Sequence, residues 1–191
     1  MQLVKSRPIS LPVFKSGCWF DDFAVTGAND PGYALNMSSL KEPLPYGIRL
    51  RAKPEGKPAN MVIPIKYSYS DFKAEIKTKY GAGSCNVFIF RLGDTNNRWM
   101  LQMVNNTSLS LLKVSSSVYT NVGSISDSFS NMRTIGISAI GPNIDIFLDH
   151  RKIISVTDVA NINNKIMQLD AYSETLGLAY GEWQYLAVKP L

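Results

Sequence analysis

The sequence predicts an all-β protein, a sandwich of two antiparallel sheets, and three observations carry this prediction. Apolar and polar residues alternate with a period of two along most of the chain, as expected for strands with one buried and one solvated face. Turn-forming residues recur about every 8–12 residues, which divides the chain into roughly ten to thirteen short strands. No long segment has the apolar stripe of an amphipathic helix.

Length and composition favour one soluble domain. The chain has 191 residues, of which 45% are hydrophobic and 10% aromatic, enough to build a core and to exclude a disordered chain. Two Cys in this length exclude a disulfide scaffold, and no apolar run reaches the roughly 18 residues of a membrane span. We expect an extended N-terminal arm over residues 1–16, interrupted by Pro8 and Pro12, and a single sandwich domain over residues 17–191.

The N-terminal residues have no apolar segment of the kind found in signal peptides. We therefore expect the protein to be made in the cytoplasm and either kept there or incorporated in a virion.

The clearest strands can be placed from their alternation. In residues 72–80, Phe72, Ala74, Ile76 and Tyr80 at even positions alternate with charged residues at odd ones, and residues 48–53 alternate in the same way. Residues 87–90 are apolar on both faces and predict a central strand. A hairpin turn is expected at residues 105–108, and the Ser- and Asn-rich residues 115–131 are expected to be a polar connection.

Residues 132–158 resemble the signature of the concanavalin A-like sandwiches, which include laminin-G-like and keto-disaccharide-hydrolase-like domains. A strand, a Gly-Asn type turn, the strand Ile144–Asp149, a tight turn and a short strand ending in Asp158 follow one another as in that family. Further similarity extends the resemblance over about residues 65–188. It implies a concanavalin A-like jelly-roll fold, which serves lectins, glucanases, adhesion modules and virus-particle proteins alike.

The tight turn departs from that family, which usually has Asp-Gly where this chain has Asp149 and His150. Because His tolerates a positive φ better than most residues, we interpret His150 as a turn residue.

The sequence shows no catalytic set, and we assign no catalytic residue. Glycoside hydrolysis needs two carboxylates about 5–9.5 Å apart, and the related glucanases carry them as Glu-x-Asp-x-x-Glu on one strand. This chain has no acidic pair two residues apart, and Asp145 and Asp149 would lie roughly 13 Å apart along a strand. With a single His, at a hairpin tip, a Ser-His-Asp or Cys-His site is not supported either.

Ligand-binding candidates are aromatic residues and loop oxygens. Trp99 and Trp183 lie within predicted strands and are expected in the core, whereas residues nearer loops or the N-terminus could stack on sugar rings; these are Tyr119, Tyr172, Tyr180 and Trp19. Calcium is the one metal considered, through oxygens of Asp94, Asn96 and Asp158, with turn formation as the alternative interpretation of these residues. No other cofactor is expected.

The net charge of +5 is concentrated in residues 49–79, which hold eight basic residues against three acids. The candidate basic patch consists of Arg49, Arg51, Lys53, Lys73, Lys77 and Lys79. These residues are the outward positions of two strands, which would form a docking patch if the strands were neighbours. Nucleic-acid binding usually needs denser basic residues with interleaved aromatics, so it is not expected.

These observations lead us to predict a non-enzymatic structural or attachment component of a multi-subunit particle, a phage or virus virion protein of the capsid-decoration or tail type. Its partners would be other protein subunits, in a homo-oligomer or a particle. The lack of a signal peptide and of a catalytic set supports this prediction. The alternative is a soluble carbohydrate-binding, lectin-like module, and a third candidate is a glycoside-modifying hydrolase.

Overall fold

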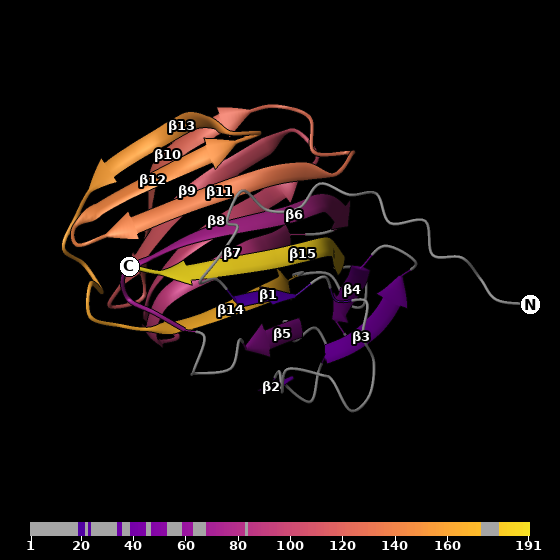
Figure 1. Cartoon of the computed structure of the whole chain (residues 1–191), viewed down its shortest axis with the longest axis horizontal. Helices are drawn as coiled ribbons and strands as arrows, with labels where there is room; N and C mark the ends of the chain where they lie inside the picture. The colour runs from indigo at the N-terminus through magenta and orange to yellow at the C-terminus, as the bar shows by residue number, and fades with distance from the viewer. Residues whose placement is uncertain are drawn as a thin grey trace, which may run out of the picture.

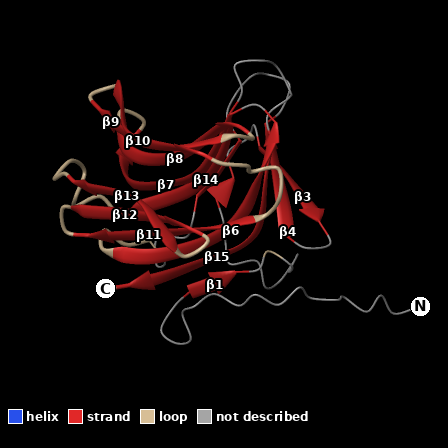
Figure 2. Ribbon diagram, turned by 90° about the horizontal axis from the view of Figure 1, so that it is seen from above, coloured by secondary structure: helices blue, strands red, loops and turns tan. Residues whose placement is uncertain are grey.

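The computed structural model describes residues 19–21, 23, 34–35, 39–44, 47–52, 59–62, 68–82, 84–172 and 180–191. Within them every regular element is a strand, and the strands form two antiparallel sheets (Figure 1). Seen from above, the sheets lie as two layers (Figure 2). The predicted all-β sandwich is confirmed, whereas the expected arm of residues 1–16 lies outside the described residues.

The first layer is an eight-stranded sheet whose centre is formed by strands from distant parts of the chain. Strand β15 pairs with β6 along one side, and on the other side with β4 and then with β1. The strand order is β13 (Arg151–Thr157), β12 (Asn143–Leu148), β11 (Arg133–Ile140), β6 (Phe72–Ala82), β15 (Tyr180–Pro190), β4 (Gly47–Ala52) and β3 (Ser39–Leu44), with β1 (Trp19–Asp21) beside β15.

The second layer is a seven-stranded sheet built around the hairpins of the middle of the chain. Its strand order is β10 (Val118–Ser126), β9 (Ser108–Ser115), β8 (Asn97–Asn105), β7 (Ser84–Asp94), β14 (Ile166–Tyr172), β5 (Ala59–Val62) and β2 (Ala34–Leu35). The turn between β8 and β9 confirms the predicted hairpin, and the position of β7 between β8 and β14 confirms the predicted central strand.

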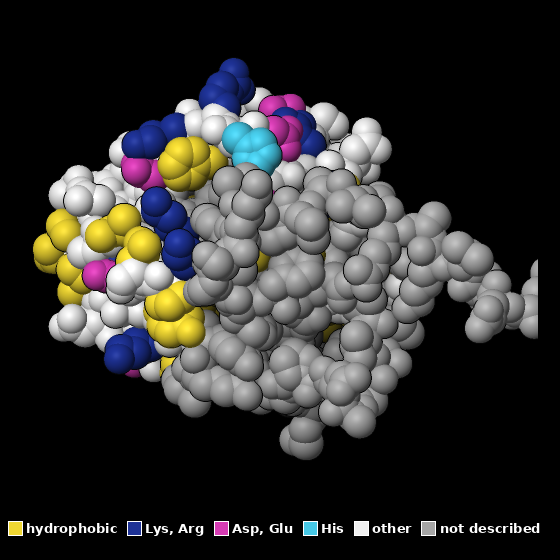
Figure 3. Space-filling model, viewed as in Figure 1, with side chains coloured by type: hydrophobic (Ala, Val, Ile, Leu, Met, Phe, Trp, Pro, Cys, Tyr) yellow, Lys and Arg dark blue, Asp and Glu magenta, His cyan; other side chains and the backbone are white. Residues whose placement is uncertain are grey.

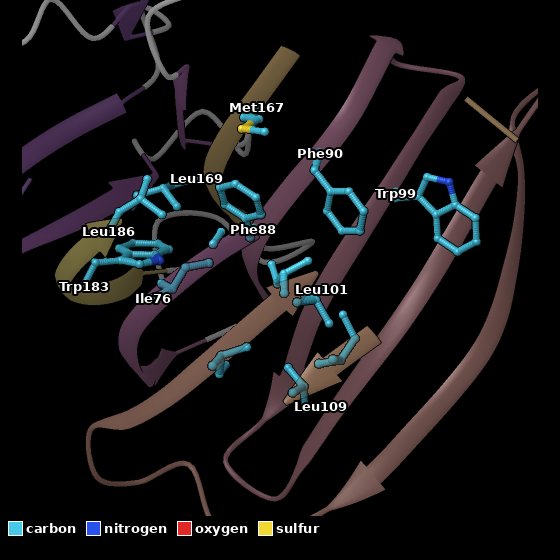
Figure 4. Packing of buried hydrophobic residues seen from close by; sticks show 14 of the residues in the cluster. Ile76, Phe88, Phe90, Trp99, Leu101, Leu109, Met167, Leu169, Trp183 and Leu186 are labelled. Atoms are coloured by element: carbon cyan, nitrogen blue, oxygen red, sulfur yellow. The ribbon is translucent and has the colours of Figure 1, made fainter. Parts of the chain in front are cut away.

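The core lies between the two sheets and is formed by the apolar positions of the alternating strands. On β6, Phe72, Ala74 and Ile76 are buried, while Phe88 and Phe90 come from β7 in the facing layer (Figure 4). The Phe72 ring meets the Phe90 ring edge to face, with centroids 5.7 Å apart. Edge-to-face packing places the positive edge of one ring against the negative face of the other. The predicted core positions of Trp99 and Trp183 are confirmed, since both are fully buried.

The interpretation of residues 115–131 as a connection is wrong, because they contain β10. Among the described strands this one lies at the edge of its sheet and pairs with β9, and its first residues are exposed. An edge strand with little buried surface needs few apolar residues, which is why its Ser and Asn content hid it. Tyr180, which was expected nearer a loop, belongs to β15 as its first residue.

Candidate functional site

The outward face of the eight-stranded sheet carries chemically varied side chains on β6, β11 and β12. Ile137 of β11 and Ile146 of β12 point into the core, so their neighbours along each strand point outward. The pairing register then aligns two outward rows across the sheet. One row joins Glu75, Gly136 and Phe147, and the next joins Lys73, Ser138 and Asp145.

These rows border a hollow of about 460 Å³, which is the candidate site. Gly136 has no side chain to fill the middle of its row, and a Cβ there would lie 3.2 Å from Cβ of Phe147. The lining includes charged, polar and aromatic side chains, those of Lys73, Glu75, Ser138, Asp145, Phe147 and His150. Figure 3 views the molecule from the side of this sheet, with the chain's one histidine in cyan.

Two carboxylates that differ in their exposure to solvent line the hollow. Glu75 is 6% exposed and accepts a hydrogen bond of 2.6 Å from the Tyr185 hydroxyl. Asp145 is more accessible; its Oδ2 accepts from Nζ of Lys152 at 2.8 Å and its Oδ1 from the Ser155 hydroxyl at 2.6 Å. These two hydrogen bonds, that of Lys152 first, lower the pKa of Asp145, so this carboxylate is ionised at neutral pH.

The tight turn between β12 and β13 places His150 at the rim of the hollow. Asp149 and His150 both have positive φ, 45° and 69°, which confirms the interpretation of His150 as a turn residue. Asp149 fixes the turn on β11, because its Oδ1 accepts from the Thr134 amide at 3.0 Å and its Oδ2 from Nε of Arg133 at 2.7 Å. His150 is therefore both a turn residue and a residue that borders the hollow.

A second hollow, of about 380 Å³, adjoins the first at the β12–β13 side. The two share Ser138, Ile140 and Asp145, and the second adds Asn143, Lys152 and Ser155. Ile140 is 44% exposed, so the shared wall offers an apolar surface as well as polar groups.

The two aromatic candidates whose side chains the structure describes, Tyr119 and Tyr180, do not line the hollow. Tyr119 lies on β10 of the other sheet; it is 59% exposed, and its hydroxyl accepts a hydrogen bond of 2.9 Å from Arg98. Tyr180 lies on β15, and the Arg49 guanidinium is 4.5 Å from the centroid of its ring. Trp19 and Tyr172 are the first residue of β1 and the last of β14, and their side chains lie outside the described residues.

The basic patch is divided by β15, which lies between β4 and β6. Glu182 of β15 forms ion pairs with Arg49 at 2.5 Å and with Lys79 at 2.8 Å, so two of the cations share one buried carboxylate. Arg51 lies on β4 and Lys77 on β6, whereas Lys53 lies outside the described residues. Of the patch residues that the structure describes, Lys73 alone lines the hollow.

The oxygens considered for calcium have other partners. Asp94 Oδ1 accepts hydrogen bonds from the Asn96 amide at 2.7 Å and from the Asn97 side chain at 3.1 Å, which is turn formation. Asp158 pairs with Lys113 at 2.6 Å and accepts from the Ala160 amide at 2.7 Å. In the part of the chain that the structure describes, no three His, Cys, Asp or Glu side chains gather as metal ligands would.

We expect the folded protein to lose stability in acid. Ion pairs and hydrogen bonds to Lys113, Arg133 and Lys152 lower the pKa values of Asp158, Asp127 and Asp145. Carboxylates with lowered pKa values stabilise the fold above their unfolded pKa of about 4, and this contribution disappears as the pH falls through their folded values. Urea unfolding should therefore give a nearly constant midpoint from pH 7 to 5 and a falling one from pH 5 to 3. Asp158→Asn should flatten the fall; a midpoint that rises in acid would contradict this expectation.

Phe147 and Glu75 were not among the site residues expected from the sequence. The signal for Phe147 was present, since it occupies a solvent-facing position in a strand whose Ile144, Ile146 and Leu148 face the core. A single apolar side chain on the outward side of a strand is common, so this signal marks Phe147 as solvent-facing and no more. Glu75 gave no such signal, because its place beside Gly136 follows only from the pairing of β6 with β11.

The sequence matches no family model and no curated protein sequence, so the comparison with known proteins rests on structure. The carbohydrate binding module CBM66 from Bacillus subtilis is similar with a TM-score of 0.63 at 16% identity, over 82% of this chain and 94% of the module. A Crh5 transglycosylase in complex with NAG gives 0.72 at 11% identity, over 92% and 84% of the two chains. The laminarinase catalytic domain from Thermotoga maritima gives 0.64 at 11%, over 91% and 97%.

These similarities correct the predicted function. The expectation of a structural virion component is wrong: the similar structures are a carbohydrate-binding module, glycoside hydrolases and transglycosylases, and none points to a virus particle. The carbohydrate-binding alternative fits them better. In addition, the described residues include no helix that could cross a membrane.

The same comparisons confirm the resemblance first seen in residues 132–158. The similar structures, with TM-scores of 0.63 to 0.72, cover most of this chain. At identities of 11–16%, this similarity establishes the fold and leaves activity open. The chain has the concanavalin A-like jelly-roll fold.

Proposed function

We propose that the protein is a carbohydrate-binding module that holds its ligand in the hollow between β6, β11 and β12. The observation that carries the proposal is the combination of an apolar ring with donors and acceptors around one depression. Phe147 offers an apolar face, Ser138 a hydroxyl, and Lys73 and Asp145 groups of opposite charge. Sugars present apolar C–H faces and rims of hydroxyl groups, which such a lining complements.

The size of the hollow supports the same proposal. Its 460 Å³ lies within the roughly 300–1,000 Å³ of small-molecule sites. The similarity to a carbohydrate-binding module and to enzymes named for glycan chemistry adds support at the level of the fold.

Glycoside hydrolysis is the second candidate, because Glu75 and Asp145 both line the hollow. Their registers place them two strands and two residues apart, about 12 Å between Cα atoms. Because its pKa is lowered, Asp145 is ionised at neutral pH and is unsuited to act as the proton donor. An ionised Asp145 would suit only the role of the base that activates water. Binding without turnover is therefore the primary proposal.

Both candidates can be tested on one panel of oligosaccharides. The purified protein should bind at least one glycan in an array and in calorimetry, with no release of reducing ends. Reducing ends that appear with the wild type and disappear with Glu75→Gln and Asp145→Asn would instead establish a hydrolase. If no glycan binds and none is cleaved, the proposed function is wrong.

A further inference from the structure

Lys73 carries an uncompensated charge at the wall of the hollow. Its side chain is exposed, and among the described residues no carboxylate lies within ion-pair distance of it. Lys189 is the residue opposite Lys73 in the pairing of β15 with β6, and because Val188 is in the core, Lys189 also points outward. Two outward-facing lysines therefore lie opposite each other across the β6–β15 pair, and Lys73 is the one that lines the hollow.

The carboxylates that the structure describes near the hollow and on β15 are already engaged by other groups. Asp145 is paired with Lys152, and Glu182 with Arg49 and Lys79. Glu75, the nearest acid along β6, is almost fully buried and accepts from the Tyr185 hydroxyl. The exposed His150 adds a ring nitrogen donor at the rim. Lys73 is thus the charged group of the lining that has no partner among the described residues.

We infer that the ligand is an acidic glycan, with a carboxylate or sulfate group bound next to Lys73. This inference rests on the proposed function and adds the charge class of the sugar. A charge-assisted hydrogen bond between an ammonium and an anionic oxygen is about twice as strong as a neutral one. At a partly exposed site the gain corresponds to about tenfold in affinity.

The test uses matched pairs of ligands that differ only in charge. Oligogalacturonate is compared with its methyl ester, and dextran sulfate with dextran, which separates a carboxylate source from a sulfate source. The acidic member of at least one pair should bind about tenfold more tightly, and Lys73→Gln should remove most of that difference. Lys165→Gln is the matched control for general attraction to polyanions. Lys165 is exposed, and it directly precedes β14 of the seven-stranded sheet.

The outcomes separate this inference from the proposed function. Equal affinity for both members of each pair would overturn the inference and leave carbohydrate binding intact. An equal loss in Lys73→Gln and Lys165→Gln would also overturn it, because the effect would then come from net charge. If no glycan of either kind binds, the proposed function fails. Circular dichroism of both variants verifies that they are folded.

Discussion

Replacing Phe147 by Ala should lower the affinity for the glycan by about tenfold. The ring is half-buried and borders the hollow, and its own strand neighbours Ile146 and Leu148 remain in the core. If a bound sugar covers about 60 Å² of the ring, the lost contact is worth about 1.5 kcal/mol, or about tenfold in affinity. Calorimetry with the best ligand of the panel measures this change directly.

A matched variant separates the site from general effects of aromatic residues. Tyr119 is also exposed, but it lies on β10 of the other sheet. Tyr119→Ala should bind as the wild type does, and Phe147→Trp should retain binding because it keeps an aromatic face. Wild-type affinity in Phe147→Ala would contradict a site at the hollow. A loss confined to Tyr119→Ala would instead indicate a site on the seven-stranded sheet.

Replacing Arg91 by Met should lower the free energy of unfolding by about 3 kcal/mol, the usual effect of breaking a buried ionic cluster. Arg91 is fully buried, and it donates to the carbonyls of Ser70 at 3.0 Å and Gly141 at 2.7 Å and to Asp71 at 3.3 Å. Burial lowers the pKa of Arg91, and Asp71 opposes this effect. Asp71 also accepts from the Gly141 amide, so the cluster ties the β11–β12 turn to the start of β6.

Thermal unfolding gives the measurement, with an expected decrease of about 6–12 °C for a chain of this length. Asp71→Asn should have a smaller effect, because Arg91 keeps its two carbonyl partners. Arg133→Met is the control: Arg133 pairs with Asp127 and Asp149 near the surface, where ion pairs contribute about 1 kcal/mol or less. If Arg91→Met is no more destabilising than Arg133→Met, the buried cluster does not stabilise the turn as argued.

Alternation along the chain was sufficient to predict the fold class, because buried and exposed positions differ chemically in the central strands. On β6, for example, Phe72, Ala74 and Ile76 are buried while Lys73 is exposed, as the sequence indicated. The method failed at β10, whose Val118, Tyr119 and Thr120 are all exposed at a sheet edge. There the pairing with β9, rather than burial, maintains the strand.

The candidate site could not be predicted because it depends on which strands pair. Lys73 and Asp145 are far apart in the sequence, and both become neighbours of Ser138 only through the order β6–β11–β12. Acids on one strand, such as Asp145 and Asp149, can be compared from the sequence alone. The pair Asp145 and Glu75 is recognised only when the pairing of β6, β11 and β12 is known. The absence of a side chain at Gly136, which opens the hollow, also has meaning only beside Phe147.

The central claim is that the hollow on the eight-stranded sheet binds a glycan. The most direct measurement is a titration of isotope-labelled protein with the best-binding oligosaccharide, followed by NMR. The account predicts that the largest amide shifts occur at Gly136, Ser138 and Phe147. Shifts concentrated instead on the outward positions of the seven-stranded sheet, such as Arg98, Gln102 and Gln168, would contradict it.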